Sequence, residues 1–170
     1  MQNAMDGDLD PSRARSLPSC GRPGCICALP VGERFLLWAL RQWQCELTGW
    51  QYDTTLPLEG SALLDGFRTA GLLDTLADFA ALMDVLHFGT RRPLEIHAPL
   101  CACQSSDEAT LIALCILAQA GRDEPLQVSL DTMMVQPAAR VAAQRLKTFA
   151  TALAEAGLNL PPSVAGGRLN

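Results

Sequence analysis

Five cysteines and one histidine in two short stretches are the residues whose types and spacing could do chemistry. Each stretch contains a Cys-x-Cys pair, and each pair has one further donor a few residues ahead of it. Thiolate sulfur and imidazole nitrogen are the ligands of closed four-coordinate zinc sites, and thiolates hold iron–sulfur clusters. The candidate metal ligands are therefore Cys20, Cys25, Cys27, Cys101, Cys103 and His97.

The spacing of these cysteines leaves three interpretations open. Cysteine pairs that bind zinc usually have two to four residues between them. Neither Cys-x-Cys pair has that spacing, whereas Cys20-x4-Cys25 falls at its upper end. The first interpretation is a zinc or iron–sulfur site, which leaves the cofactor itself unknown. The second is packing of Cys101 and Cys103 at a helix entrance, because a free cysteine behaves as a small hydrophobic residue. The third is a pair of redox-active thiols.

A predicted helix start just after Cys103 supports the two interpretations in which this cysteine is reactive, as a metal ligand or as a redox-active thiol. Ser105 and Glu108 have the spacing of a capping box, in which each side chain accepts the other residue's backbone amide. The first-turn amides and the helix dipole favour a nearby thiolate. We expect the pKa of Cys103 to be modestly lowered, because these amides are fixed whereas the carboxylates of Asp107 and Glu108 can turn to water.

Other catalytic signatures are absent from the sequence. It has no phosphate-binding glycine-rich loop, no His-Glu-x-x-His and no Gly-x-Ser-x-Gly. We therefore predict that the protein is not an enzyme. A net charge of −5 and a single lysine, Lys147, argue against nucleic acid as a partner.

Composition also bears on location. The sequence has seven cysteines, an odd number, and we find neither a signal peptide nor an apolar run near the roughly 20 residues of a membrane span. We expect reduced thiols, a cytoplasmic location and no membrane partner.

Apolar residues recur at helical spacing through most of the chain. Hydrophobic residues make up 49% of it and charged residues 18%. The pattern predicts an all-α fold, a compact bundle of about five helices. The expected helices span residues 31–47, 60–69, 72–87, 106–120 and 137–156. Thr48-Gly49 is expected to stop the first helix. Leu126, Val128 and Leu130 alternate with polar residues, so this stretch is predicted to be an extended connection.

The distribution of proline, glycine and apolar residues divides the chain into three parts. Residues 1–29 are predicted to be a flexible or irregular arm that contains Cys20, Cys25 and Cys27. Residues 30–160 are the expected helical domain, and 161–170 a C-terminal tail.

Two functional hypotheses follow from these features. The first is a non-enzymatic helical module for protein–protein interaction or regulation, expected to form a homodimer or to bind a protein partner. It depends on the low charge and on tryptophans at positions 38, 43 and 50. The alternative is a small thiol-based protein that binds zinc or an iron–sulfur cluster, or senses redox state, through its two Cys-x-Cys pairs.

Overall fold

The fold of the chain is all-α, as predicted. The computed structural model describes residues 26–52 and 61–161, in which two short 3-10 turns accompany six α-helices, one more than expected. No strand occurs in these residues, and the one β-bridge between described residues joins Thr90 to Met134. The elements are η1 (Ile26–Ala28), α1 (Val31–Tyr52), α2 (Ala62–Thr69), η2 (Leu73–Thr75), α3 (Leu76–Gly89), α4 (Ser106–Gln119), α5 (Asp123–Met133) and α6 (Gln136–Glu155).

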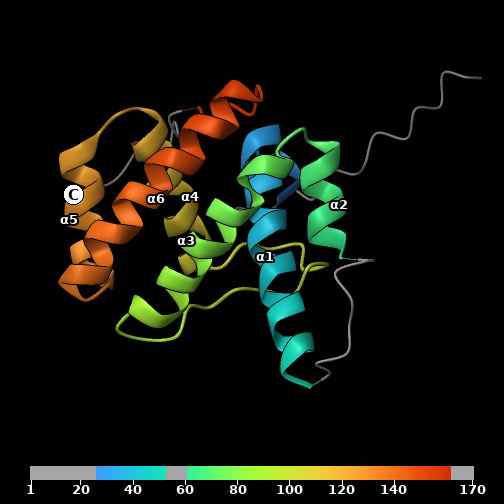
Figure 1. Ribbon diagram of the computed structural model, residues 1–170, viewed down its shortest axis with the longest axis horizontal. Coiled ribbons are helices and arrows are strands. Elements are labelled where there is room, and N and C mark those ends of the chain that lie inside the picture. The colour runs from blue at the N-terminus through green and yellow to red at the C-terminus, as the bar shows by residue number, and fades with distance from the viewer. Residues whose placement is uncertain (1–25, 53–60, 162–170) are drawn as a thin grey trace, which may run out of the picture.

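Helix α6 organises the core. It packs against α3, α4 and α5, and α1 packs against α4. Helices α5 and α2 lie at opposite ends of the molecule (Figure 1). Phe67 of α2, Phe79 of α3 and Phe149 of α6 are fully buried, and their ring centroids lie 5.2–6.3 Å apart. These aromatic contacts join three helices that are distant in sequence.

The predicted capping box at the start of α4 is confirmed. Ser105 Oγ accepts the amide of Glu108 at 3.1 Å, and Glu108 Oε2 accepts the amide of Ser105 at 2.8 Å. The helix buries Leu111, Leu114 and Cys115, among other residues, so it is central as expected.

One predicted element and one predicted helix end were wrong. The expected extended connection is helix α5, because Leu126 and Leu130 are buried one turn apart while Val128 between them is 59% exposed. Three alternating apolar residues thus resembled a strand although only the outer two face the core. Helix α1 also continues through Thr48-Gly49 to Tyr52, because one glycine costs a helix only about 1 kcal/mol.

The described part of the predicted arm is more regular than expected. Residues Ile26–Ala28 form the η1 turn, and Ile26 and Leu29 pack against the hydrophobic core. The rest of the arm, including Cys20 and Cys25, lies outside the described residues, as does the tail from residue 162. Within the described chain, no helix combines the length and hydropathy that crossing a membrane requires.

Candidate metal site

The α3–α4 connection, residues 90–105, carries three of the six predicted ligands. It begins with backbone bonds to the end of α5: the amide of Arg91 donates to Met133 O at 2.9 Å, and that of Val135 donates to Gly89 O at 3.1 Å. The connection then crosses α1 before reaching α4 (Figure 1). Because the connection has no helix or strand of its own, hydrogen bonds from side chains of the neighbouring helices must hold its backbone in place.

A buried ion pair between α1 and α4 holds the part of the connection that carries the cysteines. The Arg41 guanidinium, 2% exposed, donates to both carboxylate oxygens of Glu108 at 2.8 and 2.9 Å. The same guanidinium donates to the backbone carbonyls of Cys101 and Cys103, each at 2.6 Å. Glu108 is fully buried and also accepts the amide of His97 at 3.0 Å. One ion pair thus holds the backbone of all three candidate ligands.

A second ion pair positions the preceding part of the loop. Arg92 donates to both oxygens of Asp107 at 2.6 and 2.7 Å, and Asp107 also accepts the amide of Glu95 at 2.7 Å. The Arg92 guanidinium lowers the pKa of Asp107, and the hydrogen bond from Glu95 adds to that effect. Asp107 and Glu108 are both buried. The expectation that these carboxylates turn to water was wrong, because each is the acceptor for an arginine.

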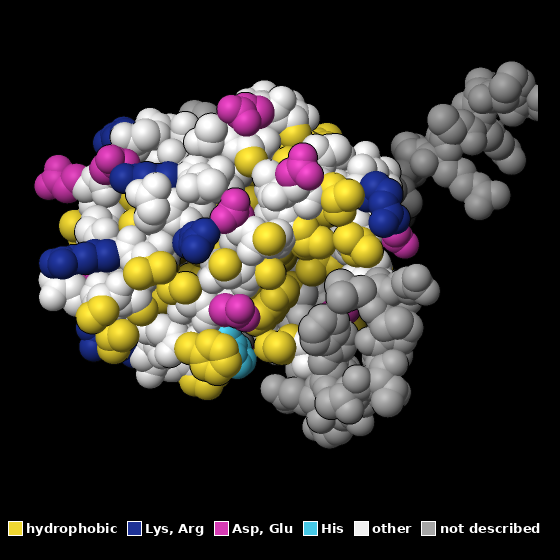
Figure 2. Space-filling model, viewed as in Figure 1, with side chains coloured by type: hydrophobic (Ala, Val, Ile, Leu, Met, Phe, Trp, Pro, Cys, Tyr) yellow, Lys and Arg dark blue, Asp and Glu magenta, His cyan; other side chains and the backbone are white. Residues whose placement is uncertain are grey.

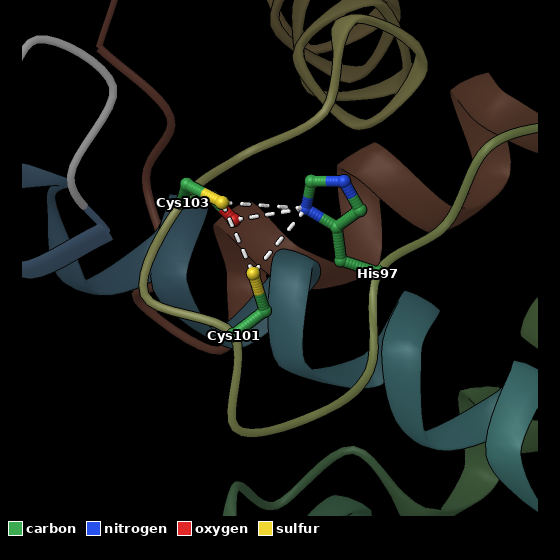
Figure 3. A group of neighbouring side chains, drawn as sticks. All are labelled: His97, Cys101 and Cys103. Carbon is green, nitrogen blue, oxygen red and sulfur yellow. Dashed lines mark hydrogen bonds between the residues drawn. The ribbon is translucent and has the colours of Figure 1, made fainter.

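The three side chains on this loop converge on one point (Figure 3). His97 Nδ1 lies 3.6 Å from Cys101 Sγ and 3.8 Å from Cys103 Sγ, and the two sulfurs are 3.0 Å apart. Tetrahedral zinc, with bonds of about 2.3 Å to sulfur and about 2.0 Å to nitrogen, implies separations of roughly 3.8 Å between sulfurs and roughly 3.6 Å between sulfur and nitrogen. The nitrogen–sulfur distances already fit a zinc ion, and the sulfurs need to separate by about 0.8 Å. We call these three residues the loop thiol site.

The imidazole of His97 has a partner on each ring nitrogen. Nδ1 lies 3.2 Å from the carbonyl of Cys103, and Nε2 lies 3.5 Å from the carboxylate of Glu95. The carbonyl only accepts, so Nδ1 donates in this contact. A metal on Nδ1 would replace that hydrogen bond and would require the tautomer with the proton on Nε2, where the Glu95 carboxylate can accept it. Histidine ligands in metalloproteins commonly make such an outer hydrogen bond to a carboxylate.

The pKa values of the two thiols shift in opposite directions. The pKa of Cys101 is lowered, chiefly because its sulfur accepts a hydrogen bond from the Cys103 thiol, with a further contribution from the positive charge of Arg41. The pKa of Cys103 is raised, chiefly because its thiol donates that hydrogen bond, with a smaller contribution from desolvation. The expected lowering was therefore assigned to the wrong cysteine. Hydrogen bonding to the Cys103 carbonyl raises the pKa of His97.

Other cysteines of the chain do not contribute to the cluster of described ligands. Cys27 is exposed on η1, and its sulfur does not join the cluster of three. Cys20 and Cys25, also predicted as ligands, lie outside the described residues. Cys115 is buried in the core, where burial raises its pKa to about 12, so it is an inert packing residue.

Arg41 is the site residue that sequence reasoning missed. As a charged residue next to the apolar stripe that includes Leu36 and Leu40, it is expected to face water. A signal was nevertheless present, since Arg41 follows the buried Leu37 by one helical turn and so extends a second buried face. Its acceptor, Glu108, was identified only as a capping residue.

No described protein family, curated protein or solved structure matches this chain.

Proposed function

We propose that the protein is a non-enzymatic helical module that binds a soft divalent metal ion, zinc by preference, at the loop thiol site. One observation carries the proposal: the ligand atoms of His97, Cys101 and Cys103 lie within 4.8 Å of one another. The hydrogen bonds from Arg41 to both cysteine carbonyls support it, because ligands on a positioned backbone lose less freedom on binding metal.

The donor set favours zinc over the other candidates. Two thiolates with one imidazole suit zinc, whereas iron–sulfur clusters are held mainly by four cysteine thiolates. A redox-active pair would need only Cys101 and Cys103, with His97 lowering the pKa of Cys101. A metal site uses all three side chains as ligands, and the distances from His97 Nδ1 to both sulfurs suit that use. The orientation of His97 Nε2 towards Glu95 supports metal ligation as well.

The test is metal analysis of full-length protein purified without an affinity tag and under reducing conditions. We expect one zinc ion per chain, lost in the Cys101→Ser/Cys103→Ser variant. Cys45→Ser is the matched control, because Cys45 is exposed on α1 and outside the cluster. Metal-free protein that also fails to take up added zinc would refute the proposal, and a Cys101–Cys103 disulfide formed reversibly in its place would favour the redox hypothesis.

A second candidate is the homodimeric interaction module expected from the sequence. The observation that favours it is Phe88, which is 82% exposed at the end of α3 and adjoins Val85, Val135 and Val141. Figure 2 shows apolar side chains interspersed with charges of both signs on the face that includes α3 and α6. A second copy of the chain would cover the Phe88 surface through a two-fold interface.

The oligomeric state tests this second candidate. Sedimentation equilibrium should give a dimer that Phe88→Asp dissociates. Val128→Asp is the matched control, since Val128 is an exposed apolar residue on α5 that does not line that surface. A monomer at all concentrations would exclude self-association.

A further inference from the structure

A cavity of about 330 Å³ lies between α1, the end of α3 and the first part of the α3–α4 connection. Cavities that hold small molecules in proteins have volumes from about 300 Å³ upwards, so this one is large enough for a small ligand. Its apolar lining includes Trp43, Met83 and Ile96. Trp43 and Met83 are buried, so they form the wall of the cavity that faces the hydrophobic core.

The charged part of the lining is cationic. Arg91 and Arg92 both line the cavity, and no aspartate or glutamate of the described chain does. This balance contrasts with the net charge of −5 of the whole chain. It also contrasts with the cavity beside Leu76, which is lined by the carboxylates of Glu46 and Asp84. The charge of the lining therefore favours an anion as the ligand.

The two arginines differ in the partners that they already have. Arg92 donates to both carboxylate oxygens of Asp107, so its charge is balanced within the protein. The guanidinium of Arg91 makes no hydrogen bond or ion pair with the residues that the structure describes. The backbone of Arg91 is nevertheless anchored, because its amide donates to Met133 O at 2.9 Å. Arg91 therefore offers its N–H donors to a ligand from a fixed point of the chain.

We infer that this cavity binds a small carboxylic acid with an apolar body, with its carboxylate on Arg91 and its body against Trp43 and Met83. A guanidinium matches a carboxylate through two parallel hydrogen bonds. The apolar wall stabilises an apolar body by removing it from water. Inorganic phosphate would satisfy the arginine equally well and leave that wall unused, so the lining favours the carboxylic acid.

The inference does not depend on the proposed zinc site. None of the three residues of the loop thiol site lines the cavity. The Cys101→Ser/Cys103→Ser variant should therefore bind carboxylates as the wild type does. Failure of zinc binding and failure of carboxylate binding are thus separate results.

The experiment titrates ¹⁵N-labelled full-length protein with hexanoate, 3-phenylpropionate and 2-naphthoate, and separately with inorganic phosphate. At least one of the carboxylates should shift the indole N–H resonance of Trp43 saturably. The resonance of Trp38, which packs over Gly66 and does not line the cavity, should stay unchanged. The primary amide of the same acid should bind at least about tenfold more weakly, because hydrogen bonds between two charged groups are the stronger ones.

Variants separate the two parts of the site. Arg91→Gln should weaken binding of the carboxylate at least about tenfold. Arg140→Gln removes the same charge from an exposed position on α6 outside the cavity and should match the wild type. Leu94→Trp places a larger side chain in the lining without a change of charge and should weaken binding of both the acid and its amide. Circular dichroism confirms that each variant is folded.

Three outcomes would overturn the inference. The cavity is not a carboxylate site if none of the three acids shifts the Trp43 resonance. Equal weakening by Arg91→Gln and Arg140→Gln would show a general effect of net charge, without a specific contact to Arg91. Phosphate that binds as tightly as the best carboxylate would show that the apolar wall contributes nothing to the ligand.

Discussion

Arg41 and Glu108 form a bidentate, fully enclosed ion pair across 67 residues of sequence, and it joins α1 to the first turn of α4. Burying two charges is costly unless every polar atom finds a partner. Here the carboxylate accepts two bonds from Arg41 and the amides of His97 and Ser105. Two further N–H groups of the guanidinium donate to the carbonyls of the cysteine loop. The pair therefore connects the stability of the fold to the shape of the loop thiol site.

Replacing Arg41 should destabilise the fold and distort the loop together. Arg41→Met leaves Glu108 charged and buried without its main partner, and we expect it to lower the free energy of unfolding by about 3–5 kcal/mol. Urea unfolding of the metal-free protein measures this loss. Arg34→Met, at an exposed position on the same helix, should change it by less than about 0.5 kcal/mol. A loss near that of Arg34→Met would show that the pair contributes little.

Asp107 should make stability depend on pH in the acid range. The pKa of Asp107 in the folded protein lies below its ordinary value of 3.8, chiefly because of the hydrogen bonds from Arg92. Its contribution to stability is therefore fully present above that value and is lost as the pH falls through the lower, folded pKa. Asp107→Asn removes this contribution. The difference in unfolding free energy between wild type and variant should be constant above about pH 5 and should shrink below about pH 4. A difference independent of pH would contradict the assignment.

Gly66 should be intolerant of alanine although it lies within helix α2. In an open helix, alanine is more favourable than glycine by about 1 kcal/mol. A Cβ atom at Gly66 would collide with the indole ring of Trp38, which packs directly over this position. We expect Gly66→Ala to destabilise the fold by about 1–3 kcal/mol because the ring must move. Adding Trp38→Leu should recover part of the loss. If Gly66→Ala alone stabilises the protein, the indole does not constrain α2 as the structure indicates.

Glu95 should strengthen zinc binding without being a ligand. Its carboxylate faces Nε2 of His97, and outer partners of this kind change metal affinity by roughly 10- to 100-fold. Because the Glu95 side chain is 69% exposed, we expect the lower end of this range for Glu95→Gln in a competitive zinc titration. Glu155→Gln, at the far end of α6, serves as the charge-matched control. Equal zinc affinity in Glu95→Gln and the wild type would show that Glu95 does not contribute to zinc binding.

Local sequence was sufficient to predict those features of the structure whose stabilising interactions span only a few residues. The capping box joins Ser105 to Glu108 within one helical turn, so its residue types and spacing identify it. The all-α class follows in the same way from apolar residues that recur within each helix. The same approach failed at α5, because alternation over five residues cannot distinguish a strand from a helix that buries only Leu126 and Leu130.

The sequence by itself determined the helical class and the start of α4, and it named the candidate metal ligands. Only the tertiary structure decided that His97, Cys101 and Cys103 meet at one point, that Cys27 does not join them, and that Arg41 holds their backbone. The physical reason is the range of the interactions. A loop without regular hydrogen bonds takes its shape from whatever side chains reach it, and the deciding one here comes from a helix 60 residues earlier in the chain.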